Sequence, residues 1–403
     1  MIAGSSTRPA CCVPSTASFR GRDRFCLHTL LRALLVMLPA ACERADDRSV
    51  IIGLAWPEDP PYAPLVAQAL IDSTTSPGEP LILVRPVGAG EASDSGSLET
   101  DVSQAMQLAA GSNVIAVVGH PSSTGALLAA PIYTEAGIPI LVPTATTRRL
   151  ASAGHLVFPL VPNDSVEGAF IAHFAVERLA AHTVLLFHVV DDYGVGLASG
   201  VEDALDELGA TVLDRVPVRL DQPCPPFSDI NHYQVQVDAS LLKGEPDVVV
   251  VAGRRWELGC IAQALHERVE GTPVIAGDGV APLDSVVTDT AGPALDFVYL
   301  VTFWDPEAAT PQATAFRERF RRMAGRAPRA DEALVHDAIM LVATAVREVG
   351  ADREAVGEYL RSLGRNRPPY TGVVGEIDFE TGRQRPLLMM RFMDGQPRRV
   401  ELP

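Results

Sequence analysis

The stretch of the chain that decides the fold is Asn113–Thr147, with the sequence NVIAVVGHPSSTGALLAAPIYTEAGIPILVPTATT. It reads as a buried strand over Val114–Val118, a hydroxyl-rich turn over His120–Thr124, a helix from about Gly125 to Glu135 and a second buried strand over Ile138–Val142. Short apolar runs on either side of a helical segment indicate a βαβ unit with parallel strands. Ligands of open α/β sheets bind beyond the carboxyl ends of the strands, so the polar residues after each strand are candidates for a binding site.

Composition limits the kinds of partner. The chain has 403 residues, of which 47% are apolar and 21% charged, as is usual for a globular protein. Its formal net charge is −17. Nucleic acids and anionic membrane surfaces are bound by basic patches, so we expect no nucleic-acid partner.

The first 41 residues differ from the rest of the chain. Arg20, Arg22 and Arg24 precede an apolar run at 33–41, and small residues stand directly before Cys42. This pattern is typical of a secretory signal peptide, and the run is too short to span a bilayer. The residues around Cys42 also resemble a bacterial lipoprotein signal, which predicts a lipid on that cysteine and a protein held at the membrane in the periplasm or at the cell surface. Plain secretion with cleavage nearby is the alternative.

The cysteines that remain after export are few. Of six cysteines in the chain, three leave with the leader and Cys42 would carry the lipid, so that Cys224 and Cys260 are left. Two thiols in an oxidising compartment often form a disulfide. Two separately buried thiols are the alternative.

The rest of the chain alternates short apolar strands with segments of helical period. This order predicts further βαβ units, and it occurs on both sides of Pro162, which argues for two lobes of one type. A β-hairpin is expected around the turn at 380–382. The other predicted strands lie at 49–55, 81–84, 183–189, 211–218, 247–252, 272–276 and 298–303, and the helices at 62–72, 99–110, 166–180, 194–208, 229–242, 258–269, 311–324, 331–349 and 353–363.

Hydroxyl residues follow both strands of the opening stretch. Capping of the helix explains one of Ser122, Ser123 and Thr124, but not all three. A helix N-terminus suits a carboxylate, and we favour Ser123 as a ligand contact. Thr144 and Thr146 share one face of an extended chain, and we favour Thr146, although a plain polar turn would also place hydroxyls there.

Further polar residues follow the strands of the second half. Tyr193 comes after the strand at 183–189, Arg254 and Arg255 after 247–252, and Asp278 after 272–276. All would reach the carboxyl edge of the second sheet. Packing on a helix is the alternative for Tyr193, and surface salt bridges are the usual fate of such charges.

Motifs of catalysis and cofactor binding are absent from the sequence. Gly194–Gly200 has one residue too many for the dinucleotide fingerprint, and there is no phosphate loop, no Gly-x-Ser-x-Gly and no His-Glu-x-x-His or Cys/His metal spacing. We therefore expect that the protein is not an enzyme and that it holds neither a cofactor nor a metal ion. A hydrolase that assembles its serine, histidine and aspartate from distant positions is the alternative.

Several segments together resemble the branched-chain amino-acid-binding proteins, the type 1 periplasmic solute-binding proteins of ABC importers. The resemblance covers essentially the whole chain after the leader. It is carried by VVGHPSS at 117–123, APIYTEAGIP at 130–139, PTAT at 143–146, VPND at 161–164, DYG at 192–194 and YTGVVG at 370–375.

This resemblance implies roles for individual residues. Ser123 and Thr146 match the family's contacts to a ligand carboxylate, and the backbone of Ser122 and Thr144 would assist them. Tyr193 matches an aromatic residue that lines the cleft, and Asp278 matches the acidic residue that meets the ligand's ammonium group. Trp56 corresponds more loosely to an aromatic residue of the first lobe. Arg254 and Arg255 depart from the pattern, because the family carries aromatic residues there, and a cation suits a polar or acidic ligand better than leucine.

The resemblance also implies the architecture and the function. The fold would be α/β, with two Rossmann-like lobes that have parallel-sheet cores and a hinge of three crossings near Pro162, Phe303 and Pro369. Residues 50–162 and 304–369 would form the first lobe and 163–303 and 370–403 the second, after a linker at 42–49. The protein would capture an amino acid or small carboxylate by hinge closure and deliver it to an ABC permease in the membrane. A sensory module of the same fold, serving a receptor or regulator, is the alternative.

Overall fold

The computed structural model describes residues 49–56, 62–87, 98–280, 285–379, 387–393 and 396–401. The predicted signal peptide at 1–41, Cys42 and the turn at 380–382 lie outside these residues. The described part of the chain forms two lobes, each built on its own sheet.

The first lobe is built on a parallel sheet with the strand order β2-β1-β3-β4-β5. Every residue of β3 is buried, as expected for a central strand covered on both faces. The strands are β1 (Ser49–Ala55), β2 (Leu81–Pro86), β3 (Val114–Gly119), β4 (Ile140–Val142) and β5 (Val157–Pro159).

The second lobe repeats this plan. Its sheet has the order β14-β13-β10-β9-β8-β6-β7. Strands β6 to β10 are parallel to one another, whereas β13 is antiparallel to β10 and β14 is antiparallel to β13. The prediction of two α/β lobes with parallel-sheet cores is therefore confirmed. The strands are β6 (Thr183–Val189), β7 (Thr211–Val218), β8 (Val248–Ala252), β9 (Val274–Ala276), β10 (Val298–Thr302), β13 (Leu388–Met393) and β14 (Gln396–Arg399).

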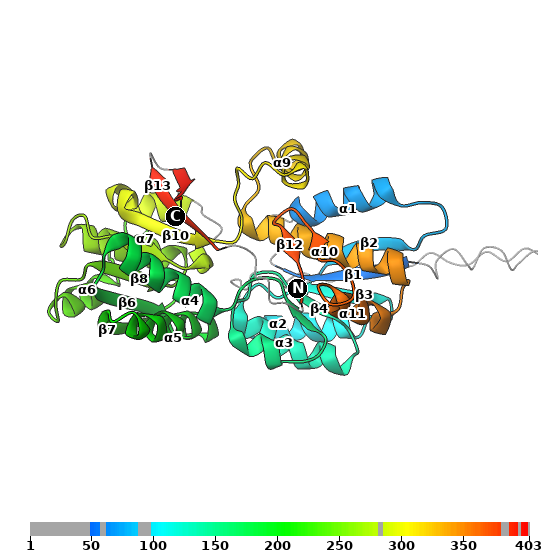
Figure 1. Cartoon of the computed structure of the whole chain (residues 1–403), viewed down its shortest axis with the longest axis horizontal. Helices are drawn as coiled ribbons and strands as arrows, with labels where there is room; N and C mark the ends of the chain where they lie inside the picture. The colour runs from blue at the N-terminus through cyan, green and yellow to red at the C-terminus, as the bar shows by residue number, and fades with distance from the viewer. Residues whose placement is uncertain are drawn as a thin grey trace, which may run out of the picture. The chain divides into compact units, whose positions relative to one another are not determined.

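Helices cover the sheets within each lobe. In the first lobe α2 and α3 pack beside β1 and β4, and α1, α10 and α11 pack beside β2 and β3. In the second lobe α5 packs on β6, β7 and β8, and α4 packs on α5 (Figure 1). The helices are α1 (Tyr62–Thr74), α2 (Leu98–Ala109), α3 (Ser123–Glu135), α4 (Asp164–His173), α5 (Asp192–Glu207), α6 (Gln234–Leu241), α7 (Arg255–His266), α8 (Ser285–Ala291), α9 (Pro311–Ala324), α10 (Ala330–Val349) and α11 (Arg353–Ser362). None of these helices, within the described part of the chain, has the length and apolar character that crossing a bilayer requires.

The C-terminal segment differs from its prediction. Residues Tyr370–Thr371 (β11) pair with Glu376–Ile377 (β12), whereas β13 pairs with β10 and β14, so the expected hairpin between 370–379 and 386–392 is wrong. Val373, Val374 and Ile377 are buried in the same core as α10. Asp337 on α10 accepts the backbone N–H groups of Val373 and Val374 at 2.7 and 2.9 Å. The segment 370–379 therefore belongs to the first lobe, and the chain joins the second lobe after Phe379 rather than near Pro369.

One predicted helix begins later than expected. The sequence predicts a helix over the whole of 229–242, but α6 starts only at Gln234. The Asn231 side chain accepts the Tyr233 backbone N–H at 3.0 Å and donates to the Cys260 carbonyl at 2.8 Å. An Asn that bonds to nearby backbone competes with helix formation, which explains the late start.

A disulfide holds this region to α7. Cys224 and Cys260 are both fully buried and form a disulfide across 36 residues of sequence. The alternative, that Cys224 and Cys260 are two separate buried thiols, is therefore wrong.

Opening this disulfide is expected to destabilise the second lobe. Closing a loop of this length restricts the unfolded chain, and the chain-entropy relation gives about 3–4 kcal/mol for it. Thermal unfolding of the protein should therefore show a lower midpoint with reductant than without. A midpoint that reductant leaves unchanged, once thiol counting shows that both cysteines are reduced, would contradict this.

Candidate functional site

The two hydroxyl-bearing loops start from neighbouring strand ends. β3 and β4 are adjacent and parallel, and Val117 pairs with Ile140. At the end of β3, Gly119 has a φ of +139°, and a Cβ there would collide with the Ala55 carbonyl oxygen. Only glycine fits a backbone that turns this close to β1. The loops after β3 and β4 therefore emerge side by side, as predicted.

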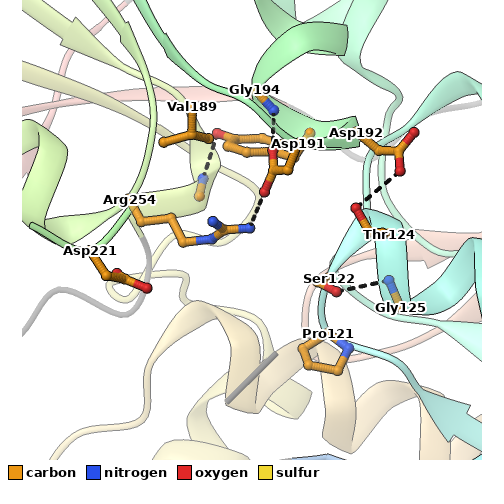
Figure 2. Close-up of polar contacts among 12 residues, drawn as sticks. Pro121, Ser122, Thr124, Gly125, Val189, Asp191, Asp192, Gly194, Asp221 and Arg254 are labelled. Carbon is orange, nitrogen blue, oxygen red and sulfur yellow. Dashed lines mark hydrogen bonds and ion pairs between the residues drawn. The ribbon is translucent and has the colours of Figure 1, made fainter. Parts of the chain in front are cut away.

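The three hydroxyls of the first loop have different surroundings. Ser122 caps α3, since its Oγ accepts the Gly125 backbone N–H at 3.0 Å. The Thr124 hydroxyl donates to Asp192 of the second lobe at 3.0 Å (Figure 2). Ser123 is only 2% exposed, and its Oγ has no hydrogen-bond partner in the described part of the chain. Capping thus explains Ser122 and leaves Ser123 with a buried hydroxyl to satisfy.

The second loop is tied to the first. Thr144 donates its hydroxyl to the Pro121 carbonyl at 2.9 Å. Thr146 is 2% exposed, and among the described residues its Oγ1 makes no hydrogen bond of normal geometry. Its carbonyl accepts the Asp164 N–H at 2.8 Å, where the chain enters α4. Thr146, like Ser123, therefore has a buried hydroxyl without a well-formed hydrogen bond, although this hydroxyl faces the Asp164 carboxyl group.

His120 lies beneath the first loop. It is fully buried, with Nδ1 2.7 Å from Asp101 Oδ1 and Nε2 3.1 Å from the Tyr133 hydroxyl. Both ring nitrogens are thus occupied on the inner side of the lobe, so His120 holds the loop in place and does not face a ligand.

Two of the predicted second-lobe residues come together at the end of β9. Tyr193 lies in the first turn of α5, is 6% exposed, and accepts the Gly279 N–H with its hydroxyl at 2.9 Å. Asp278 begins the 3-10 turn Asp278–Val280, and its Oδ1 is buried without a partner among the described groups.

Arg254 lies at the N-terminus of α7. Its Nη2 is 2.7 Å from Asp191 Oδ2 (Figure 2), while Nη1 is buried without a partner among the residues described. Burial alone would lower the pKa of Arg254, but Asp191 outweighs it and raises that pKa. Arg254 is therefore a half-buried cation with one unpaired guanidinium nitrogen, whereas Arg255, the first residue of α7, is exposed.

Two carboxyl groups of this region were not predicted as site residues. Asp164 and Glu167, in the first turn of α4, are 1% and 0% exposed. They are buried because glycines let α4 approach α5 closely: a Cβ on Gly200 would lie 2.6 Å from the Asp164 carbonyl oxygen. The pattern Gly196-x-x-x-Gly200 is the signal that could have revealed this contact. We call Asp164, Glu167 and Asp278 the carboxyl cluster.

Burial makes the carboxyl cluster hard to ionise. It raises the pKa of Asp164 to about 7 and that of Asp278 to about 6, and raises that of Glu167 well above its usual value. Thr146 lowers the pKa of Asp164, and Glu167, Tyr193 and Arg254 lower that of Asp278.

Replacing Asp164 by Asn is expected to stabilise the ligand-free protein at high pH. An acid whose folded pKa is raised contributes stability that is present below its unfolded pKa of 3.8 and is lost as the pH rises through about 7. This loss amounts to roughly 4 kcal/mol. Urea unfolding should show that the free energy of unfolding falls less between acidic and alkaline pH in Asp164→Asn than in the unaltered protein. Equal losses in both would contradict a buried, hard-to-ionise Asp164.

Trp56 lies at the end of β1, half-buried against the first-lobe core. The residues that follow, 57–61, lie outside the described part of the chain. Trp56 is thus on the correct strand edge, but no described contact ties it to the other site residues.

The arrangement suits binding better than catalysis. Ser123 Oγ has no basic side chain hydrogen-bonded to it among the described residues, and His120 is occupied elsewhere. The same residues contain no group of three or more His, Cys, Asp or Glu placed to hold a metal ion. Hydroxyls and a helix N-terminus in one lobe favour an anion, and the carboxyl cluster in the other favours a cation. A zwitterion matches both.

Comparison with known proteins gives consistent results. A family model described as periplasmic binding protein matches residues 88–397. An amino acid binding protein of Pseudomonas aeruginosa is 29% identical over 251 residues, which are 62% of this chain and 64% of that protein. A leucine-, isoleucine-, valine-, threonine- and alanine-binding protein of the same organism is 25% identical over 265 residues, 64% of this chain and 66% of that protein. The chain thus aligns with just under two thirds of the length of these relatives.

The fold is shared with solved structures. A leucine-binding protein from Thermotoga maritima superposes with a TM-score of 0.74 at 24% identity, covering 87% of this chain and 98% of that one.

Proposed function

Because the chain belongs to the periplasmic binding protein family, we propose that it captures an amino acid or related small carboxylate and delivers it to the membrane permease of an ABC importer. The predicted family and its two-lobed fold are thereby confirmed. As a member of a family of binding proteins the chain is not an enzyme, so the hydrolase alternative is wrong.

One observation carries the proposed ligand class. Buried polar atoms without partners in the described structure occur in both lobes: Ser123 Oγ and Thr146 Oγ1 in the first, Asp278 Oδ1 in the second. Buried polar groups are normally hydrogen-bonded, and leaving one unpaired costs about 1–3 kcal/mol. A ligand carboxylate would satisfy the hydroxyls and an ammonium group the carboxylate. The backbone of Ser122 and Thr144 would assist, and Tyr193 and Trp56 would line the ligand.

Arg254 supports a polar or acidic side chain on the ligand. Its unpaired Nη1 is a charge-assisted donor that an aliphatic side chain would leave unsatisfied. Preference for L-glutamate over L-leucine, reversed by Arg254→Leu, is the expected consequence.

Delivery would depend on hinge closure. The chain passes between lobes after β5 and after β10, and again beyond Phe379. Such binders close around their ligand, and a closed form stabilised only by ligand lets a permease distinguish loaded from empty protein. The proposal includes export of the chain and a lipid anchor on Cys42.

A thermal-shift screen tests the ligand class. The protein without its first 41 residues would be heated with each of the twenty L-amino acids and with small carboxylates. We expect one or a few amino acids to raise the unfolding midpoint, because a ligand that binds only the native state stabilises it. A screen in which only another chemical class gives a shift would refute the amino-acid assignment.

A further inference from the structure

Glu167 is a fully buried carboxyl group with a defined contact. Its Oε1 accepts the Asp278 backbone N–H at 2.7 Å, across 111 residues of sequence. Its Oε2 is buried without a hydrogen-bond partner of normal geometry in the described chain. A Cβ on Gly277 would lie 3.0 Å from Glu167 Oε1 and 2.6 Å from the Tyr193 hydroxyl, so the backbone before Asp278 rests directly on Glu167.

Among the described residues, the groups that act most strongly on the pKa of Glu167 include no cation. The groups that face it are Asp164 from its own helix, Tyr193 from α5 and Asp278 from the turn after β9, and the two aspartates disfavour a further negative charge. The cation Arg254 instead lowers the pKa of Asp278. A buried carboxylate without a cation is costly, and of adjoining buried carboxyls one normally keeps its proton.

Of Glu167 and Asp278, Glu167 is the carboxyl group that more readily stays protonated. Glu167 is fully buried, whereas Asp278 is partly exposed and has the cation Arg254 nearby, which lowers its pKa. Burial and the neighbouring Asp278 raise the pKa of Glu167 well above its usual value. Glu167 is therefore the group that stays protonated when Asp278 ionises.

We propose that Glu167 is a positioning residue for ligand binding: as a neutral carboxylic acid it anchors the Asp278 backbone through Oε1 and leaves Asp278 as the anion of this pair, which meets the ligand's ammonium group. Only the last step, the contact with an ammonium group, rests on the proposed function. The proton on Glu167 is a property of the ligand-free protein.

The ligand-free protein tests this directly. Carboxyl ¹³C NMR of protein labelled at Glu and Asp would be followed against pH in the unaltered chain, Glu167→Gln and Glu167→Leu, with Asp278→Asn assigning the Asp278 signal. The Glu167 signal should stay that of a protonated acid at neutral pH. Asp278 should titrate near pH 6 in the unaltered chain and in Glu167→Gln, whose amide keeps both an acceptor and a donor. In Glu167→Leu its midpoint should rise by about one unit or more, because that interaction is lost.

A matched control is Glu177→Gln, which removes a carboxyl group that is 60% exposed and should leave the Asp278 titration unchanged. A Glu167 signal that titrates near 4.5 would overturn the proposal, and so would an Asp278 midpoint that Glu167→Leu does not move. If circular dichroism shows that Glu167→Leu is unfolded, the Glu167 signal and the Glu167→Gln titration decide alone.

Binding adds a second readout, with L-glutamate as the first probe and then any amino acid found in the screen. At neutral pH, Glu167→Gln should bind within about threefold of the unaltered protein and Glu167→Leu about tenfold or more weakly, since only the amide preserves the hydrogen bonds. Equal losses in both variants would overturn the neutral-acid role. A screen without any hit would contradict the proposed function, and the ligand-free titration would still decide this inference.

Discussion

Asp278→Asn is expected to weaken amino-acid binding at neutral pH by about thirtyfold or more, because removing one partner of a desolvated charge pair costs roughly 2–5 kcal/mol. Asparagine keeps the size of the side chain and the backbone N–H that Glu167 accepts. The loss should therefore report the charge rather than a change of fold. Calorimetric titration with the amino acid found in the screen would measure it.

The same substitution should remove a pH dependence. Burial raises the pKa of Asp278 to about 6, so its charge is present above that pH and is lost as the pH falls through it. The affinity of the unaltered protein should decline as the pH falls through about 6, whereas Asp278→Asn should bind weakly, with an affinity that does not change with pH over this range. Asp203→Asn, at an exposed position of α5, serves as the control and should behave like the unaltered protein. Affinity of Asp278→Asn within threefold of the unaltered value would refute the assigned role.

Two adjacent serines are expected to respond in opposite ways. Ser123→Ala removes a buried hydroxyl without a partner among the described residues, so the ligand-free protein should gain about 1 kcal/mol of stability while affinity falls about tenfold or more. Ser122→Ala removes the cap of α3 and should lose about 1 kcal/mol of stability. Its backbone remains in place, so its affinity should fall less than that of Ser123→Ala.

Urea unfolding and calorimetric titration of both variants measure these effects. A gain in stability together with a loss of binding is the mark of a group held unsatisfied for a ligand. If Ser123→Ala instead lost stability and kept its affinity, Ser123 would be a structural residue and the carboxylate site would lie elsewhere.

Much of the first lobe could be predicted because its signals are local. The run from Asn113 to Thr147 contains two buried apolar strands, a capped helix and hydroxyls at both strand ends, and the structure brings all of these together. The pairing of β3 with β4 follows from a short crossover, which leaves little choice of topology.

The second half of the site depends on contacts that are distant in sequence. Glu167 stands in the first turn of a helix, where an acidic residue is normally a solvated partner of the helix dipole. Only the close approach of α4 to α5 across glycines turns it into a buried acid beside Asp278. The path of the C-terminal segment is likewise set by Asp337, whose carboxylate holds the Val373 and Val374 N–H groups, and no local pattern reports that contact.

The most direct test of the account is a crystal structure of the protein with the amino acid selected by the screen. We predict one ligand per chain, with its carboxylate within hydrogen-bond distance of Ser123 Oγ and Thr146 Oγ1 and its ammonium group against Asp278. A ligand bound elsewhere, or bound with its ammonium group away from Asp278, would contradict the central claim that these buried atoms are held for a zwitterion.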